Sequence, residues 1–126
     1  MALKRLERDP QRLLPLGHKV FTVLLFLADG RKHTYAILKC MSAVATGEIK
    51  PSPGTLYGIV ARLLHQGLIR EAAERPVPEL DDARRRYYEL TDLGKVVAIQ
   101  ESQRLATLVE LARTKGLLCR QYGRAG

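Results

Sequence analysis

Residues 50–70 read KPSPGTLYGIVARLLHQGLIR, which describes one helix with both of its ends marked. Ser52 is a residue type that caps helix N-termini, and Pro53 occupies the first helical position, where its fixed φ and its missing N–H cost least. Gly67 is placed to end the helix, because glycine tolerates the left-handed backbone that helix C-termini adopt. We therefore expect a helix from position 53 to position 66.

The two faces of this helix differ in kind. Apolar residues recur at three- and four-residue intervals, which predicts a buried stripe, made of Leu56, Ile59, Val60, Leu63 and Leu64. The opposite face is small at its centre, with Gly54, Gly58, Ala61 and His65, flanked by Thr55, Tyr57 and Arg62. Small residues on a solvent face lower helix propensity and cover nothing, so another molecule is expected to come close there. A nucleic-acid backbone and a second protein helix both fit this pattern.

The composition favours the nucleic acid. The 126 residues suit one domain with a single core. With 21 Lys and Arg against 13 Asp and Glu, the formal net charge of +8 predicts a polyanionic partner. The longest apolar run, Val20 to Ala28, is far below the ~20 residues that cross a bilayer. Neither a membrane contact nor a secretory signal is expected, so we predict a cytoplasmic protein.

The chemistry-bearing residues form no constellation typical of an enzyme. Cys40 and Cys119 lie far apart, without His or Cys neighbours at metal-ligand spacing, so neither a metal site nor a cofactor is expected. No paired carboxylates, nucleophile motif or phosphate-binding loop appears, and His18, His33 and His65 lie in helical contexts. The sequence therefore argues against an enzyme.

The segments before residue 50 complete a helix-turn-helix pattern. Residues 1–15 are rich in charge and leucine, which is typical either of a basic arm or of a short helix. Residues 16–28 are apolar on most sides and predict a central, buried helix. Residues 33–45 predict a second helix with Thr34 as its cap, and residues 46–51 predict a turn. A helix, a short turn and a helix with a small outer face form a helix-turn-helix.

Beyond position 67 the apolar period changes from 3.6 to 2. Residues 68–73 and 84–90 are expected to pair as antiparallel strands around a proline-containing loop at 74–83, which makes a wing. Thr91 then caps a further helix that is expected to reach about Gly116. The polar block Gln100–Arg104 interrupts its apolar pattern and is interpreted as a bend or a solvent window.

This last helix carries more apolar surface than its own domain needs. Its apolar residues cover more than one face, so a second copy of the same helix is the simplest partner, because most soluble homo-oligomers are twofold dimers. The candidate dimerisation residues are Val97, Leu105, Leu108, Leu111 and Ala112. The alternative is a long core helix without a partner. The expected organisation is an N-terminal arm or helix (1–15), a winged helix-turn-helix domain (16–90), a dimerisation helix (91–118) and a flexible tail (119–126).

Two strings at this distance resemble one family. Ser52-Pro-Gly-Thr-Leu-Tyr57, followed by Arg86-Tyr-Tyr-Glu-Leu-Thr91 and Gly94, resembles the PadR family of bacterial transcriptional regulators over residues 20–97. The resemblance implies a mainly α-helical winged helix-turn-helix protein with a small β-hairpin that dimerises through its C-terminal helix. It also implies binding of palindromic operator double-stranded DNA, usually as a repressor, with release by a small-molecule effector in some members. The chain has no tryptophan to stack on such an effector, so no particular ligand is predicted.

The resemblance and the outward face together define the candidate DNA contacts. They are Lys50, Ser52, Gly54, Thr55, Tyr57, Gly58, Ala61, Arg62, Arg84, Arg85 and Arg86. The chain departs from the family pattern at Thr34 and Gly58, where glycine and proline are usual. The wing loop is acidic and is expected to stand off the phosphates, owing to Glu74, Glu79, Asp81 and Asp82. The alternative function is a winged helix that binds another protein instead of DNA.

Overall fold

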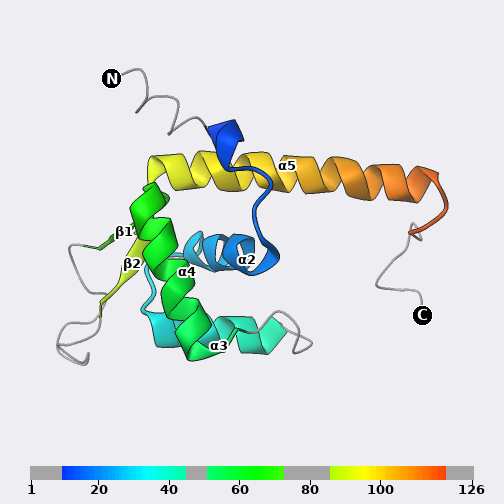
Figure 1. Ribbon diagram of the computed structural model, residues 1–126. Coiled ribbons are helices and arrows are strands. Elements are labelled where there is room, and N and C mark those ends of the chain that lie inside the picture. The colour runs from blue at the N-terminus through cyan, green and yellow to red at the C-terminus, as the bar shows by residue number, and fades with distance from the viewer. Residues whose placement is uncertain (1–9, 45–50, 73–85, 119–126) are drawn as a thin grey trace, which may run out of the picture.

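The computed structural model describes residues 10–44, 51–72 and 86–118 (Figure 1). Lys50, Arg84, Arg85, Cys119, the acidic loop, the first nine residues and the expected flexible tail lie outside these ranges. The described elements are η1 (Pro10–Leu13), α2 (His18–Leu27), α3 (Thr34–Val44), α4 (Pro53–Gln66), β1 (Ile69–Glu71), β2 (Tyr88–Leu90) and α5 (Asp92–Thr114). The fold is mainly helical with one small hairpin, as the sequence predicts.

The helix α2 lies at the centre of the molecule, between α5 on one side and α3 on the other (Figure 1). It buries four apolar side chains, Val20, Val23, Leu24 and Leu27. The other elements close the core around it with Ile37, Met41, Leu56, Val60, Leu63, Leu68, Ile69, Leu90 and Val97. Each such side chain contributes about 1.5–3 kcal/mol when it leaves water, so these contacts hold α4 in place.

The capping residue of α3 differs from the expected one. The Nδ1 atom of His33 accepts a hydrogen bond from the backbone N–H of Ala36 at 3.1 Å, and the helix begins at Thr34. The expectation that Thr34 caps this helix is wrong, because a capping side chain belongs to the residue before the first helical one.

Within the described residues, the two strands of the hairpin cover fewer positions than the sequence pattern predicts. The strands β1 and β2 pair antiparallel, with Ile69 opposite Leu90 and Glu71 opposite Tyr88. Lys32, in the turn between α2 and α3, adds a bridge that the sequence pattern does not predict. Its N–H donates to the Tyr88 carbonyl at 3.2 Å, and its carbonyl accepts from the Tyr88 N–H at 2.9 Å. This bridge ties the wing to the helix-turn-helix.

The helix α5 runs without a break over 23 residues and extends beyond the body of the molecule (Figure 1). The expected bend or solvent window at Gln100–Arg104 is wrong, because Glu101 points inward and is 1% exposed. Its Oε2 atom accepts from the Leu16 N–H at 3.3 Å, and Arg104 donates to both carboxylate oxygens at 2.7 and 2.8 Å. A buried carboxylate satisfied in this way anchors the N-terminal segment on α5.

Candidate nucleic-acid interface

The helix α4 begins and ends where the sequence indicates. The Oγ atom of Ser52 accepts from the Thr55 N–H at 3.2 Å, and Pro53 is the first helical residue. Gly67 adopts a φ of 76°, the left-handed backbone that ends the helix. The Ser52 hydroxyl donates to Thr55 Oγ1 at 3.0 Å, so the Thr55 hydroxyl proton remains available to an acceptor outside the helix.

The inward stripe of α4 is narrower than expected. Leu56, Val60 and Leu63 are buried, and Ile59 is partly buried. Leu64 keeps 38% of its surface exposed, so its expected burial is wrong. Its side chain lies at the margin of the stripe, because the 100° step between helical residues turns it away from Leu56 and Val60.

The outward face of α4 is small and open. Gly54, Thr55, Gly58, Ala61 and Arg62 are exposed, and Tyr57 is 60% exposed. A Cβ atom added at Gly54 or Gly58 would meet no atom within 4 Å, so packing within the described chain does not require either glycine. Contacts with the described residues therefore do not explain why these two positions are small.

The described carboxylates are confined to part of the fold. The helices α2, α3 and α4 contain no Asp or Glu at all. Within the described ranges, the carboxylates lie in the α2–α3 turn, the wing and α5, at Asp29, Glu71, Glu89, Asp92, Glu101 and Glu110. No carboxylate on these three helices would repel a polyanion that approaches α4.

Of the three candidate wing arginines, Arg86 lies within the described residues, and it forms an ion pair with a carboxylate. Its Nη1 atom lies 3.2 Å from the Glu71 carboxylate, and both side chains are exposed. An exposed ion pair contributes only about 0–1 kcal/mol, so Arg86 can exchange Glu71 for a phosphate at small cost. Arg62, in contrast, makes no ion pair or hydrogen bond with any described residue.

The Glu89 carboxylate binds two arginines at the base of the wing. Glu89 accepts from Arg70 at 2.8 Å and from Arg31 at 2.9 Å. The hydrogen bond from Arg70, supported by Arg31, holds the pKa of Glu89 below its ordinary value. Glu89 therefore stays ionised and couples β2 to the turn that precedes α3.

Thr91 joins the end of α4 to the start of α5. Its hydroxyl donates to the Gly67 carbonyl at 2.6 Å and accepts from the Gly94 N–H at 3.0 Å. Its own N–H donates to the Leu68 carbonyl at 3.1 Å. Gly94 packs so closely on Leu68 that a Cβ atom would lie 2.0 Å from the Leu68 carbonyl oxygen. The orientation of α4 relative to α5 is thereby set at this junction.

The candidate dimerisation residues divide into two groups. Val97 is fully buried in the core of its own subunit, so its assignment to a subunit contact is wrong. Leu108 and Leu111 are 48% and 52% exposed, and Leu105 and Ala112 are partly buried. The helical period places all four on the face that Val97 presents to the core. Beyond the body, this apolar stripe continues without cover from the described chain.

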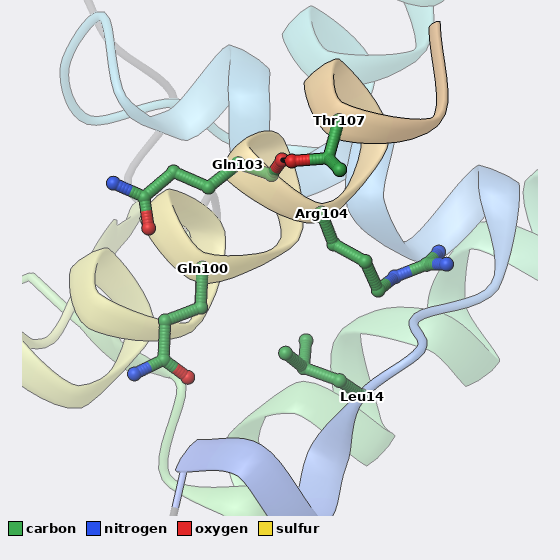
Figure 2. Close-up of a pocket in the computed structure, with 5 residues that line it drawn as sticks. All are labelled: Leu14, Gln100, Gln103, Arg104 and Thr107. Atoms are coloured by element: carbon green, nitrogen blue, oxygen red, sulfur yellow. Dashed lines mark hydrogen bonds between the residues drawn. The ribbon is translucent and has the colours of Figure 1, made fainter. Parts of the chain in front are cut away.

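An open depression lies between the N-terminal segment and α5 (Figure 2). Its volume is about 490 Å³, and its lining residues are Leu14, Gln100, Gln103, Arg104 and Thr107. The Oε1 atom of Gln100 is buried without a hydrogen-bond partner in the described structure. Nothing in the sequence pattern points to this depression, because Leu14 reaches it only through tertiary packing.

Metal sites and membrane spans are absent from the described ranges. No group of three or more His, Cys, Asp or Glu residues is arranged there to hold a metal ion. None of the described helices is long and apolar enough to cross a membrane.

Solved structures similar to this chain include transcription regulators. The PadR family regulator from Clostridium difficile R20291 superposes with a TM-score of 0.65 at 21% identity, over 78% of this chain and 97% of that one. A regulator from Clostridium thermocellum gives a TM-score of 0.64 at 22% identity, over 78% and 89% of the two chains. A mutant of MarR from E. coli gives 0.67 at 21% identity, over 94% and 79%. Because the sequence identities are only 21–22%, the similarity to these structures establishes a shared fold.

The sequence places the chain more narrowly within this class. Residues 23–100 match the transcriptional regulator PadR-like family, and the chain belongs to it. This is a family of regulators and not of enzymes, in agreement with the sequence motifs. An uncharacterized 37.1 kDa protein in transposon TN4556 of Streptomyces fradiae is 35% identical over 86 residues, which cover 68% of this chain. The chain spans only 22% of the length of that relative.

Proposed function

We propose that this regulator represses transcription by binding a palindromic operator as a homodimer. The observation that carries the proposal is the outward face of α4, where two glycines that no described contact requires stand on a helix without carboxylates. Alanine or a charged residue would make a more stable solvent-facing helix. Close approach of a DNA duplex accounts both for the small residues on the outward face of α4 and for the lack of carboxylates on this helix.

In the proposed complex α4 enters the major groove. Gly54, Gly58 and Ala61 let the helix axis approach the duplex, while the Thr55 hydroxyl and the Gly54 N–H in the first turn bind a phosphate. Tyr57 and Arg62 reach phosphates or base edges. Few side chains then read bases directly, so specificity comes from DNA shape and from two half-sites about 34 Å apart.

The second copy in the proposed dimer covers the stripe of Leu105, Leu108, Leu111 and Ala112. Leu108→Glu places a charge at the centre of this stripe, and it should dissociate the dimer without unfolding the subunit, because the side chain is already half exposed. The matched control is Ile99→Glu, since Ile99 is 56% exposed on another face of the same helix. Sedimentation equilibrium measures both. A monomeric wild type, or equal effects of the two variants, would remove this part of the proposal.

The DNA partner is identified by incubating the purified protein with fragmented genomic DNA and sequencing what it retains. Recovered sites should be palindromic, and anisotropy titrations on them should lose about 0.9 log units of affinity per log unit of salt for each neutralised phosphate. Arg62→Gln should reduce affinity and this slope. Failure to retain any DNA at low salt, together with co-purification of a protein, would favour the protein-binding alternative.

Relief by a small molecule belongs to the same proposal. The depression beside Leu14 and Arg104 is a site in which an effector would fit, and it touches both the N-terminal segment and α5. A compound that binds there should raise the melting temperature and weaken operator binding, and Thr107→Trp, which fills the depression, should abolish both effects. An effect that survives this substitution would place the effector elsewhere.

A further inference from the structure

The outward face of α3 carries an aromatic ring beside a cation that forms no ion pair with the described residues. Tyr35 is 59% exposed, although a tyrosine of this kind normally buries much of its ring. One turn later, the Nζ atom of Lys39 lies 5.7 Å from the centre of the Tyr35 ring. Lys39 makes no ion pair with any described residue. The pair therefore offers a hydroxyl donor and a positive charge to solvent from the same helical face.

The Tyr35 ring packs against the side chain of His33. The His33 ring stacks on it with 6.3 Å between centroids and an interplanar angle of 11°. The same imidazole accepts the Ala36 N–H and meets the edge of Tyr87 at 5.1 Å. Tyr87 directly precedes β2, so the stack connects the start of α3 to the wing and restricts Tyr35 before any ligand arrives.

This stack lies close to the candidate DNA-reading helix. The helix α3, which carries Tyr35 and Lys39, packs against α4, and the two helices cross in Figure 1. Since α2, α3 and α4 lack carboxylates, a polyanion lying along these elements meets no acidic side chain from the three helices.

We propose that Tyr35 and Lys39 form a second contact with the DNA backbone, on a phosphate that borders the groove entered by α4. The Tyr35 hydroxyl donates a hydrogen bond to a phosphate oxygen, and the Lys39 ammonium neutralises its charge. His33 and Tyr87 are positioning residues, because they hold the ring without touching DNA. The inference rests on the proposed function, and it adds residues from the first helix of the helix-turn-helix, the one that lies against the backbone in such motifs.

The test uses a fluorescent random-sequence duplex of about 30 base pairs, because phosphate contacts do not depend on sequence. Lys39→Gln should weaken binding about three- to tenfold and reduce the salt slope by about 0.9. Tyr35→Phe keeps the ring and its stack but lacks the donor, so it should weaken binding several-fold and leave the slope unchanged. The control Lys95→Gln removes one charge from an exposed position on α5, across the body from α3 (Figure 1), and should have little effect.

A second readout locates the contact directly. Bound DNA should protect Lys39 from acetylation and leave Lys95 reactive, as measured by mass spectrometry of the digested protein. If Lys39→Gln changes affinity and slope no more than Lys95→Gln does, or if Lys39 acetylates equally with and without DNA, the proposed contact is wrong and the regulator still binds DNA through α4. If the wild type shows no salt-dependent binding at all, the proposed function itself fails.

Discussion

Replacing Gly58 by alanine separates the stability of α4 from its proposed role. The added Cβ would meet no atom within 4 Å, and Gly58 is exposed in the interior of a helix. Alanine is more favourable than glycine there by about 0.8–1 kcal/mol, and no packing cost offsets this gain. We therefore expect the free energy of unfolding to rise by nearly that amount, with an increase in melting temperature of about 3–6 °C.

DNA binding should respond in the opposite direction. If the duplex approaches α4 closely, the new methyl group occupies space that the DNA needs, and the helix must withdraw from the groove. A loss of at least about tenfold in affinity is expected, which corresponds to about 1.4 kcal/mol. A mutation that stabilises the protein and weakens its binding has no explanation within the isolated subunit.

The assay pairs urea denaturation with anisotropy titration on the retrieved operator, at one protomer concentration because dimerisation contributes to apparent stability. Ser102→Ala on α5 is the matched control, since it also exchanges an exposed helical residue for alanine but lies away from α4. It should stabilise modestly and leave affinity unchanged. If Gly58→Ala stabilises the protein and binds DNA as the wild type does, the reasoning about the small outer face is refuted.

Three further predictions concern the framework. Gly94→Ala places a Cβ 2.0 Å from the Leu68 carbonyl oxygen. We therefore expect the free energy of unfolding, measured by urea denaturation, to fall by about 2–3 kcal/mol despite the better helix propensity of alanine. An unchanged free energy of unfolding would contradict the close approach. Ser52→Ala removes the cap of α4 and should lower the free energy of unfolding, measured by thermal unfolding, by about 1 kcal/mol. A decrease smaller than a few tenths of a kcal/mol would show that the cap does not stabilise the helix. The hydrogen bond from Arg104, with a smaller one from the Leu16 N–H, lowers the pKa of Glu101 below the ordinary 4.5. A lowered pKa stabilises the fold above pH 4.5, and this stabilisation disappears as the pH falls through the folded-state value. The stability advantage of the wild type over Glu101→Gln should therefore be constant from pH 6 to 8 and shrink as the pH falls below about 4.5. An advantage that does not shrink at all below pH 4.5 would show that charge is not its source.

Local chemistry was sufficient to set both ends of α4, which is why the sequence predicts its bounds correctly. A capping hydroxyl, a proline and a terminal glycine act within one turn of each helix end, and the 3.6-residue period sorts the two faces without knowledge of the rest of the chain. Even so, His33 was missed as the cap of α3, because histidine is not among the usual capping residues and only the position of Ala36 reveals its role.

The tertiary structure decided which of several equivalent patterns meet a partner. Val97 and Leu108 have the same period on the same helix, and one is buried while the other is half exposed, because the body of the subunit ends between them. Glu101 looks like part of a polar interruption until Leu16, 85 residues away in sequence, donates its N–H to it. Arg86 is one of three adjacent arginines in the sequence, and only the folded hairpin, in which Glu71 lies opposite Tyr88, brings its Nη1 atom to 3.2 Å from the Glu71 carboxylate. Periodicity therefore determined the helices and their faces, whereas burial, pairing and exposure depended on contacts between segments that only folding brings together.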